Sequence, residues 1–368
     1  MHADFLLQCL AETPHLQPQD ALKWLYQSAF GCGHLLAEPD ACAASIHTER
    51  SAIAADAGQP PFTLLAGGLC RLHLASPAVR ALPAPTVARM MAETQRGIDL
   101  SAAREAYARS TALLRHCLTA PGDAPALPFS TAQWDACMAA RSADPYAPPR
   151  HSEVYRQAYR PAYRVVRRHY GETLPLLAAL ETSLAATGRA TLVLDGDCAA
   201  GKTTLAARIA GLYPSTVIHL DDFFLPFSMR TPERMAEPGG NVHRERFAQE
   251  VLDGLLRGGA FSYGVFDCHT GSTVPTAVQP RPVTILEGSY ALHPAFAPQL
   301  DRLGAVRAFL RIQPQAQAAR ILARNGAAML ARFQNEWIPL EKRYHQAYHK
   351  TWSGALPLAG DPHIADEP

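Results

Sequence analysis

The second half of the chain alternates short apolar runs with longer segments that have helical character. The runs are rich in β-branched residues, and four of them read ATLVLDG (190–196), STVIHLDD (215–222), RPVTILEGS (281–289) and AVRAFLRIQ (305–313). Apolar strands that alternate with helices are typical of a parallel sheet covered by helices on both faces. The pattern predicts an α/β fold with such a sheet over residues 188–368, and ALPLAG (355–360) is a candidate last strand.

Residues 1–148 differ, because most of their apolar residues recur at helical spacing. The spacing is clear at Leu22, Leu25, Tyr26 and Phe30, and again over 102–118. Between these segments FTLLAGGLCRLHL (62–74) predicts a strand or a hairpin. Prolines and small residues accumulate before Pro148–Pro149, which marks the predicted end of a mostly helical N-terminal domain. Nothing in this domain indicates an activity.

Residues 149–187 are predicted to form a helical connector that contains HSEVYRQAYRPAYRVVRRHY (151–170). An arginine recurs at every fourth position, which places the set along one face of a helix that Pro161 kinks or restarts. These arginines are Arg156, Arg160, Arg164 and Arg168. The face is either a solvated surface or an anion-binding arm, and both interpretations stay open.

Composition and charge narrow the class of protein. The chain has 368 residues, of which 48% are hydrophobic and 18% charged, and its formal net charge is +1. Such a balance is typical of a folded protein and argues against a broad electrostatic grip on nucleic acid. No signal peptide or bilayer-length apolar stretch is present, so we expect a cytoplasmic protein without a membrane partner. The eight cysteines include no CxxC pair, which argues against a zinc site.

A phosphate-binding motif follows the first apolar run. Residues 196–203 read GDCAAGKT and fit G-x-x-x-x-G-K-[ST], with a predicted strand before and a predicted helix after. Glycines let successive backbone N–H groups turn inward, and the helix N-terminus adds its positive end. The motif predicts a nucleoside triphosphate site built from Gly196, Asp197, Cys198, Ala199, Ala200, Gly201, Lys202, Thr203 and Thr204. We expect Lys202 to reach the β- and γ-phosphates and the Thr203 hydroxyl to ligate magnesium.

Carboxylates follow two of the later strands. Asp221 and Asp222 end the run at 215–222, and Glu287 ends the apolar part of the run at 281–289. In a doubly wound sheet the C-terminal ends of the strands gather beside the phosphate loop. We therefore expect these three carboxylates to converge on the γ-phosphate. One would take a proton from the acceptor hydroxyl, and another would hold magnesium or its water molecules. Asp222 also suits a purely structural role.

Four segments in this order, GDCAAGKTT, HLDDFFLP, ILEGSYALH and RILARNG, resemble the uridine kinase superfamily. That group includes nicotinamide riboside kinase and phosphoribulokinase, and the similarity covers about residues 188–358. The resemblance implies a kinase that uses ATP and Mg²⁺ to phosphorylate a small-molecule hydroxyl. Asp221 matches the family's general base and Glu287 its second acidic residue.

The resemblance also implies a lid. Arg320 and Arg324 lie four residues apart and match the lid arginines, which close on the phosphates and neutralise developing charge. The candidate substrate contacts are Asp222, Phe224, Arg230, His243, Tyr263, Asp267 and His269. The last two of these residues lie in SYGVFDCHTGS (262–272). In the matching segment of uridine kinases a histidine stands four residues after the aspartate, whereas His269 stands two residues after Asp267. This departure argues against uridine or cytidine as the acceptor.

The sequence thus predicts a kinase of a nucleoside, a ribosylated base or a similar metabolite. Two alternatives stay open. One is an RNA or polynucleotide end kinase that contacts the phosphate backbone through the arginines of 151–170. The other is a nucleotide-dependent switch that hydrolyses ATP without an acceptor. The sequence indicates neither the oligomeric state nor a preference for ATP over GTP.

Overall fold

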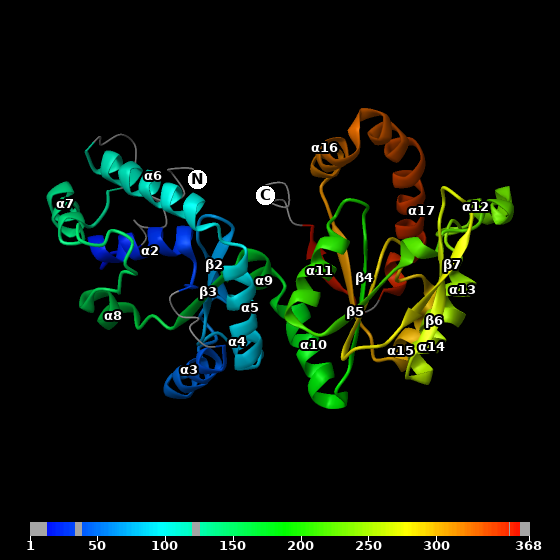
Figure 1. Cartoon of the computed structure of the whole chain (residues 1–368), viewed down its shortest axis with the longest axis horizontal. Helices are drawn as coiled ribbons and strands as arrows, with labels where there is room; N and C mark the ends of the chain where they lie inside the picture. Colours follow the sequence, from blue (N-terminus) through cyan, green and yellow to red (C-terminus); the bar gives the residue numbers. More distant parts are fainter. Residues whose placement is uncertain (1–12, 34–38, 120–125, 353, 361–368) are drawn as a thin grey trace. The chain divides into compact units, whose positions relative to one another are not determined.

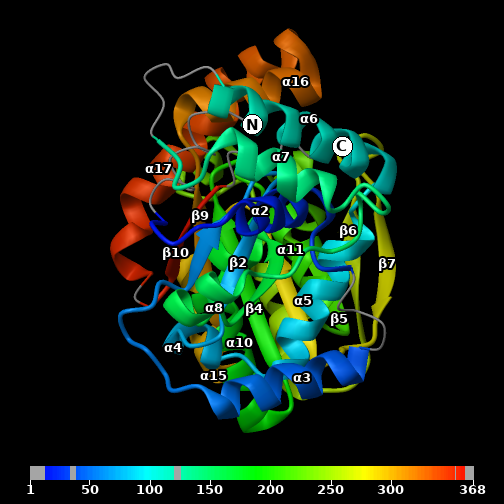
Figure 2. The same cartoon turned by 90° about the vertical axis from the view of Figure 1, so that its left-hand side faces the viewer.

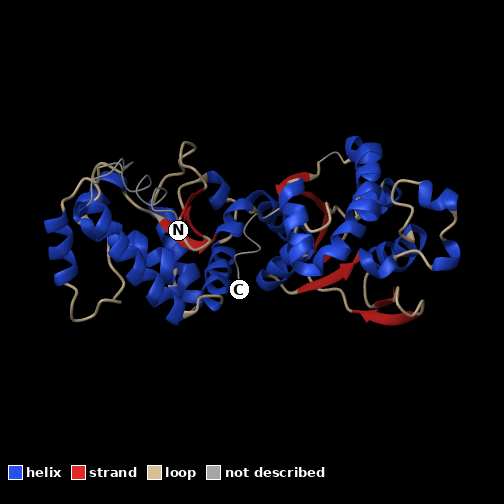
Figure 3. Ribbon diagram, turned by 90° about the horizontal axis from the view of Figure 1, so that it is seen from above, coloured by secondary structure: helices blue, strands red, loops and turns tan. Residues whose placement is uncertain are grey.

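The computed structural model describes the chain except for residues 1–12, 34–38, 120–125, 353 and 361–368. The chain divides into two compact units, Met1–Leu174 and Pro175–Pro368 (Figure 1). Helices contain more residues than strands in both units, as Figure 3 shows by colour. Among the described residues, no helix combines the length and the apolar character needed to cross a membrane.

The first unit is mostly helical, as predicted. Its helices are α2 (Pro18–Phe30), α3 (Pro39–Ala52), α4 (Pro77–Arg80), α5 (Ala84–Arg96), α6 (Leu100–Thr119), α7 (Thr131–Ala139), α8 (Glu153–Tyr159) and α9 (Arg168–Glu172). Pro18 stands at the first position of α2, where its missing N–H has no helical partner to lose. Helix α2 packs on α6 and α3 packs on α5 (Figure 2). Leu22 and Leu25 of α2 are buried in this core.

A three-stranded antiparallel sheet completes the first unit. Strands β1 (Phe62–Leu64) and β2 (Leu69–His73) form the hairpin that the run at 62–74 suggests. Strand β3 (Tyr163–Arg167) pairs with the other edge of β2, with Val165 opposite Arg71. The alternative of a hairpin is therefore confirmed, whereas β3 lies in a segment for which we predict a helix.

The predicted helix over 151–170 is wrong. Helix α8 ends at Tyr159; Arg160 follows with a φ of 42°, and Pro161 comes next. Proline disfavours the helical conformation of the residue before it and lacks the N–H that the next turn needs. The following residues instead satisfy their backbone groups by pairing with β2, and the helix resumes only at α9.

The four arginines of this segment consequently share no helix face. Arg164 lies in β3, is 8% exposed, and pairs with Glu49 at 2.7 Å. Arg156 lies in α8 and Arg168 in α9, where each pairs with a glutamate of its own short helix. The one-sided arginine face is absent from residues 151–170, all of which the structure describes.

The second unit is built on a five-stranded parallel sheet, which confirms the predicted fold class. Its strands are β4 (Ala190–Gly196), β5 (Ser215–His219), β8 (Val283–Glu287), β9 (Val306–Arg311) and β10 (Leu356–Ala359). Their order across the sheet is β10-β9-β4-β8-β5, and every neighbouring pair is parallel. The chain moves to one side of β4 and then to the other, so β4 marks the point where ligands bind in such sheets.

Helices cover both faces of this sheet (Figure 1). The α-helices are α10 (Leu174–Thr187), α11 (Lys202–Leu212), α12 (Pro232–Ala236), α13 (Arg244–Phe247), α14 (Asp253–Arg257), α15 (Ala297–Arg302), α16 (Pro314–Arg332) and α17 (Ile338–Tyr348). Short π-helical turns, η4 (Ala248–Leu252) and η6 (Phe333–Trp337), follow α13 and α16. A hydrophobic core cluster joins the sheet to α15 and α17 and includes Val193, Leu286, Phe296 and Tyr344.

Two smaller elements lie beside the sheet. A separate hairpin of β6 (Phe261–Phe266) and β7 (Thr273–Val278) is not among the predicted elements. A single turn of 3-10 helix, η2 (Leu220–Phe223), follows β5 and carries the two consecutive aspartates. Further turns of this kind are η3 (Phe227–Met229), η5 (Pro294–Phe296) and η7 (His349–Thr351).

Candidate functional site

The phosphate loop connects the central strand β4 to α11. Gly196 ends β4 with a φ of 143°, and a Cβ atom there would lie 2.1 Å from the backbone oxygen of Leu310. Gly201 precedes α11 with a φ of 96°. Because side chains rarely tolerate positive φ values, these positions explain the two glycines of the motif. The loop delivers the chain to the N-terminus of α11, whose first N–H groups lack partners within the helix.

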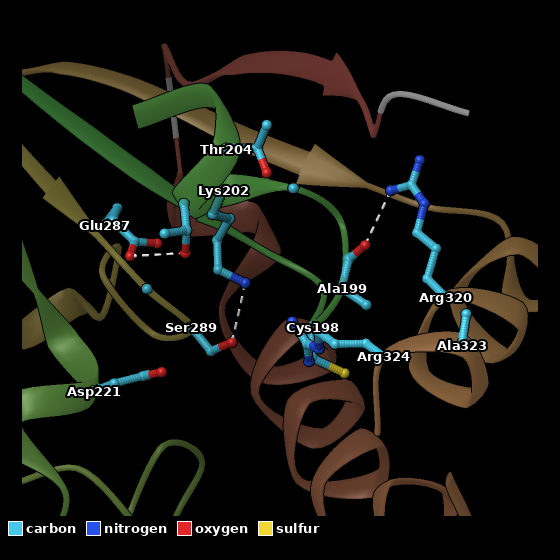
Figure 4. A pocket seen from close by; sticks show the side chains of 13 residues that line it. Cys198, Ala199, Lys202, Thr204, Asp221, Glu287, Ser289, Arg320, Ala323 and Arg324 are labelled. Carbon is cyan, nitrogen blue, oxygen red and sulfur yellow. Dashed lines mark hydrogen bonds between the residues drawn. The ribbon is translucent and has the colours of Figure 1, made fainter. Parts of the chain in front are cut away.

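A cavity of about 490 Å³ opens beside this loop (Figure 4). Its lining combines the loop, the segments that follow β5 and β8, and α16: Cys198, Ala199, Gly201, Lys202, Thr203, Thr204, Asp221, Glu287, Gly288, Ser289, Arg320, Ala323 and Arg324. All five predicted catalytic residues belong to this set. Three predicted loop residues, Gly196, Asp197 and Ala200, belong to the loop but not to the lining.

Lys202 is held at the start of α11 by three acceptors. Its Nζ donates hydrogen bonds to the backbone oxygens of Gly196 at 2.8 Å and Asp197 at 3.0 Å, and to Ser289 Oγ at 3.2 Å. The side chain is buried, so the ammonium group sits in a protein environment where its attraction for phosphate oxygens is stronger than in water. The geometry therefore fits the predicted phosphate contact.

Glu287 and Thr203 lie side by side in the cavity. Thr203 Oγ1 donates a hydrogen bond to Glu287 Oε1 at 3.0 Å. Magnesium at phosphate sites prefers oxygen ligands and takes few of them from the protein, the rest coming from phosphates and water. A hydroxyl and a carboxylate in contact fit such an ion, and they are the two residues predicted to hold it.

His219, at the end of β5, contacts the same carboxylate. Its Nδ1 lies 2.5 Å from Glu287 Oε1, and this hydrogen bond raises the pKa of His219 against the opposing effect of burial. Our sequence prediction omits His219. The available signal was its place in the STVIHLDD run, two residues before Asp221.

Asp221 points into the cavity from η2 (Figure 4). Its side chain is exposed to the cavity. The pKa of Asp221 is raised, mainly because this environment removes hydration; Lys202 opposes the shift and Glu287 adds to it. A carboxylate destabilised in this way is a better proton acceptor than a fully solvated one.

Two arginines reach the cavity from α16. Arg320 Nη1 donates to the backbone oxygen of Ala199 at 3.0 Å, and Arg324 lines the cavity one turn later. Arg324 Nε also bonds the side chain of Asn325 at 2.7 Å. Gly326 then interrupts the helix with a φ of 80° and a ψ of 172°. The spacing of four residues brings both side chains to the cavity: the Arg320 guanidinium lies on the side away from Asp221, and Arg324 extends from α16 towards Cys198 (Figure 4).

Asp222 and Tyr263 bind each other. Tyr263 OH donates to Asp222 Oδ2 at 2.8 Å, and Arg246 Nη2 donates to the Asp222 backbone oxygen at 3.0 Å. Burial, and then the bond to Asp222, raise the pKa of the Tyr263 hydroxyl. The pair ties η2 to β6 and lies outside the cavity lining, so the substrate contacts of Asp222 and Tyr263 stay predictions.

Phe224, Arg230 and His243 belong to the segment between η2 and α13. Phe224 forms an isolated antiparallel bridge within this segment. Arg230 lies with its guanidinium carbon 4.4 Å from the ring centre of Phe227, and His243 Nδ1 accepts the Arg246 N–H at the start of α13. None of the three lines the cavity, so their substrate contacts stay predictions.

Asp267 and His269 occupy the turn of the β6–β7 hairpin. Asp267 Oδ1 accepts the His269 N–H at 2.8 Å, and Asp267 Oδ2 accepts the Thr270 hydroxyl at 2.9 Å. The His269 side chain is 98% exposed. These contacts account for the turn, and neither residue lines the cavity. Their substrate roles stay predictions as well.

A parallel sheet with a glycine-rich loop after its central strand, followed by lysine and threonine at the start of a helix, defines a P-loop nucleotide-binding fold. Two solved structures that are similar to this chain are described as a possible and a putative kinase. A possible uridine kinase from Bacillus stearothermophilus is 16% identical, with a TM-score of 0.35, over 50% of this chain and 99% of that one. A putative fructose transport system kinase from Silicibacter sp. TM1040 is 23% identical, with a TM-score of 0.36, over 43% and 85% respectively.

These similarities concern the fold of about half the chain and leave the substrate open. No protein-family model and no curated protein sequence matches the chain.

Proposed function

We propose that this chain is a kinase that transfers the γ-phosphoryl group of ATP to a hydroxyl of a nucleoside-like or related metabolite. The observation that carries the proposal is the presence of Asp221 in the same cavity as Lys202 and Thr203. A nucleotide switch needs the phosphate loop and a residue that orients water, whereas transfer to an alcohol needs a proton acceptor beside the acceptor oxygen. Asp221 supplies that acceptor.

The cationic residues bind the phosphate chain in this proposal. The three acceptors of Lys202 hold its ammonium group beside the loop, and a phosphate oxygen that binds there shares or replaces one of these hydrogen bonds. Arg320 and Arg324 contribute charge to the cavity from α16. Together they neutralise negative charge on the transferred group.

A magnesium ion, when bound, supplies charge neutralisation at the β- and γ-phosphate oxygens. Thr203 and Glu287 are the residues that would hold it, directly or through its water molecules. His219 orients the Glu287 carboxylate through the 2.5 Å hydrogen bond. Asp221 remains apart from this contact and available to the acceptor hydroxyl.

The test is product formation by the purified full chain. ADP release would be measured with Mg²⁺–ATP against nucleosides, ribosides, pantothenate and phosphosugars, with mass spectrometry of the products. We expect one acceptor class to be phosphorylated and Asp221→Asn to lose at least about 100-fold in rate, as positioned acid–base groups typically contribute. Asp301→Asn, an exposed carboxylate of α15, is the matched control. Slow ATP hydrolysis that is independent of acceptor and unchanged in Asp221→Asn would refute the proposal.

The polynucleotide kinase hypothesis loses its main support. It depends on an arginine face along 151–170, and Arg164 of that set is buried against Glu49. A small-molecule acceptor is therefore the version we propose.

A further inference from the structure

Lys202 is connected to α17 through two side chains, Ser289 and Glu341, to which the sequence analysis assigns no role. Ser289 follows the Glu287–Gly288 pair, and its Oγ accepts the third hydrogen bond of Lys202 Nζ (Figure 4). The same Oγ donates to Glu341 Oε1 at 2.7 Å. Glu341 lies on α17 and is only 6% exposed. A buried carboxylate thus stands two hydrogen bonds away from the lysine of the phosphate loop.

The direction of these hydrogen bonds is fixed by chemistry. An ammonium group only donates, and an ionised carboxylate only accepts. The serine hydroxyl has a single hydrogen, which goes to Glu341, so a lone pair of its oxygen faces Lys202. Glu341 therefore sets Ser289 as an acceptor for the lysine. Bonds that involve charged groups are also stronger than neutral ones.

We propose that Ser289 and Glu341 are positioning residues that act through Lys202. They hold its ammonium group beside the loop, so that an arriving phosphate oxygen has only to share or replace one of the two backbone hydrogen bonds and the side chain need not search among rotamers. The inference rests on the proposed function only in taking a nucleotide phosphate as the ligand of Lys202.

Glu341 also has a second contact, which the test must separate. Its Oε2 accepts the backbone N–H of Cys198 at 2.9 Å, so Glu341 supports the loop itself. Ser289→Ala removes only the link to Lys202 and leaves the Cys198 contact in place. In Glu341→Gln, an amide that still accepts from Cys198 turns its NH₂ group towards Ser289 and competes with Lys202 for the serine oxygen.

The first measurement is ATP affinity of the full chain by calorimetry in the presence of Mg²⁺. We expect Ser289→Ala and Glu341→Gln each to weaken ATP binding by about tenfold, the size of one charge-assisted hydrogen bond. Ser289→Thr keeps the hydroxyl and should restore the affinity. Ser183→Ala, on α10, is the matched control and should bind ATP as the wild type does.

A double variant tests whether the two residues act in series. If they do, Ser289→Ala combined with Glu341→Gln binds ATP no more weakly than Glu341→Gln alone. Losses that multiply would overturn the proposal, as would wild-type affinity in Ser289→Ala or failure of Ser289→Thr to restore binding. Thermal midpoints of all variants show whether a loss of affinity reflects unfolding.

A readout without nucleotide keeps this inference separate from the proposed function. The rate at which acetic anhydride modifies Lys202, resolved by peptide mass spectrometry, should rise in Ser289→Ala because Nζ loses one of its three acceptors. An unchanged rate would count against the relay. A wild type that binds ATP but phosphorylates no acceptor would refute the proposed function. The ATP affinities and lysine modification rates of the variants would still test the role of Ser289 and Glu341.

Discussion

We predict that removing the hydroxyl of Tyr344 lowers the stability of the protein by an amount that depends on pH. It donates to Asp195 Oδ2 at 2.8 Å, and both side chains are fully buried. Asp195 also accepts the backbone N–H groups of Gly196, Tyr290 and Leu292 at 2.6, 3.0 and 2.9 Å. Tyr344→Phe therefore removes one of four hydrogen bonds to a buried carboxylate.

The magnitude follows from the charge of the acceptor. A hydrogen bond to a charged group contributes about 1.5–3 kcal/mol, so we expect Tyr344→Phe to lower the free energy of unfolding by about 2 kcal/mol when Asp195 is ionised. For a unit of this size each kcal/mol corresponds to about 2–4 °C in thermal midpoint. The variant should accordingly lose roughly 4–8 °C at alkaline pH.

The sign of the pH dependence follows from the pKa of Asp195. Burial raises it from 3.8 to about 6, while the hydrogen bonds, including that from Tyr344, lower it. The folded protein thus holds the proton more tightly than the unfolded chain, and stability falls as pH rises through this window. Removing the Tyr344 bond raises the folded pKa further, so the loss in Tyr344→Phe is larger at pH 8 than at pH 5.

The assay is urea unfolding at both pH values, read by hydrogen–deuterium exchange of peptides from β4 and β8. Tyr348→Phe on the same helix is the control, because the structure gives its hydroxyl no hydrogen-bond partner among the described residues. The same loss at pH 5 and pH 8, or an equal loss in the control, would refute the reasoning.

Three further predictions concern the cavity. Lys202→Met should reduce kcat/KM for ATP by at least about 100-fold, because it removes a preorganised cation at the developing charge; steady-state kinetics with a folded variant checks this. His219→Gln should destabilise the protein at pH 6 and hardly at pH 9, since the raised pKa of His219 gives a contribution that is lost as pH rises through it; thermal midpoints at the two pH values decide. The acid limb of kcat/KM should lie above the ordinary pKa of an aspartate, because Asp221 must be ionised to accept a proton and its pKa is raised; a limb at the ordinary value would contradict the role of Asp221.

The parts that could be predicted from the sequence are those with a local signature. Buried parallel strands are apolar on both faces, and each of the five strands of the main sheet appears as an apolar run. The phosphate loop is a contiguous motif, and the strand ends that follow it place Asp221 and Glu287 at one cavity. The spacing of four residues on a helix was enough to predict that Arg320 and Arg324 reach the same site.

The parts that could not be predicted depend on distant partners. The arginine spacing of 151–170 favours a helix locally, but β3 pairs with β2, which lies about 90 residues earlier in the chain. Strand β7 is mostly exposed and lacks an apolar face to mark it. A serine after a glycine and a glutamate on a polar helix resemble ordinary surface residues, so Ser289 and Glu341 become visible only when α17 lies against the loop.

The attachment of the loop to α17 has a consequence for protein synthesis. The motif at 196–203 leaves the ribosome long before its partners, since Tyr344 follows Asp195 by 149 residues and Glu341 follows Cys198 by 143. A nascent chain that ends before α17 contains the whole motif at 196–203 but lacks Glu341 and Tyr344, which hydrogen-bond to Cys198 and Asp195. If the loop binds nucleotide as proposed, a chain that stops near residue 338 should bind it more weakly than the full chain, although its sequence signature is intact.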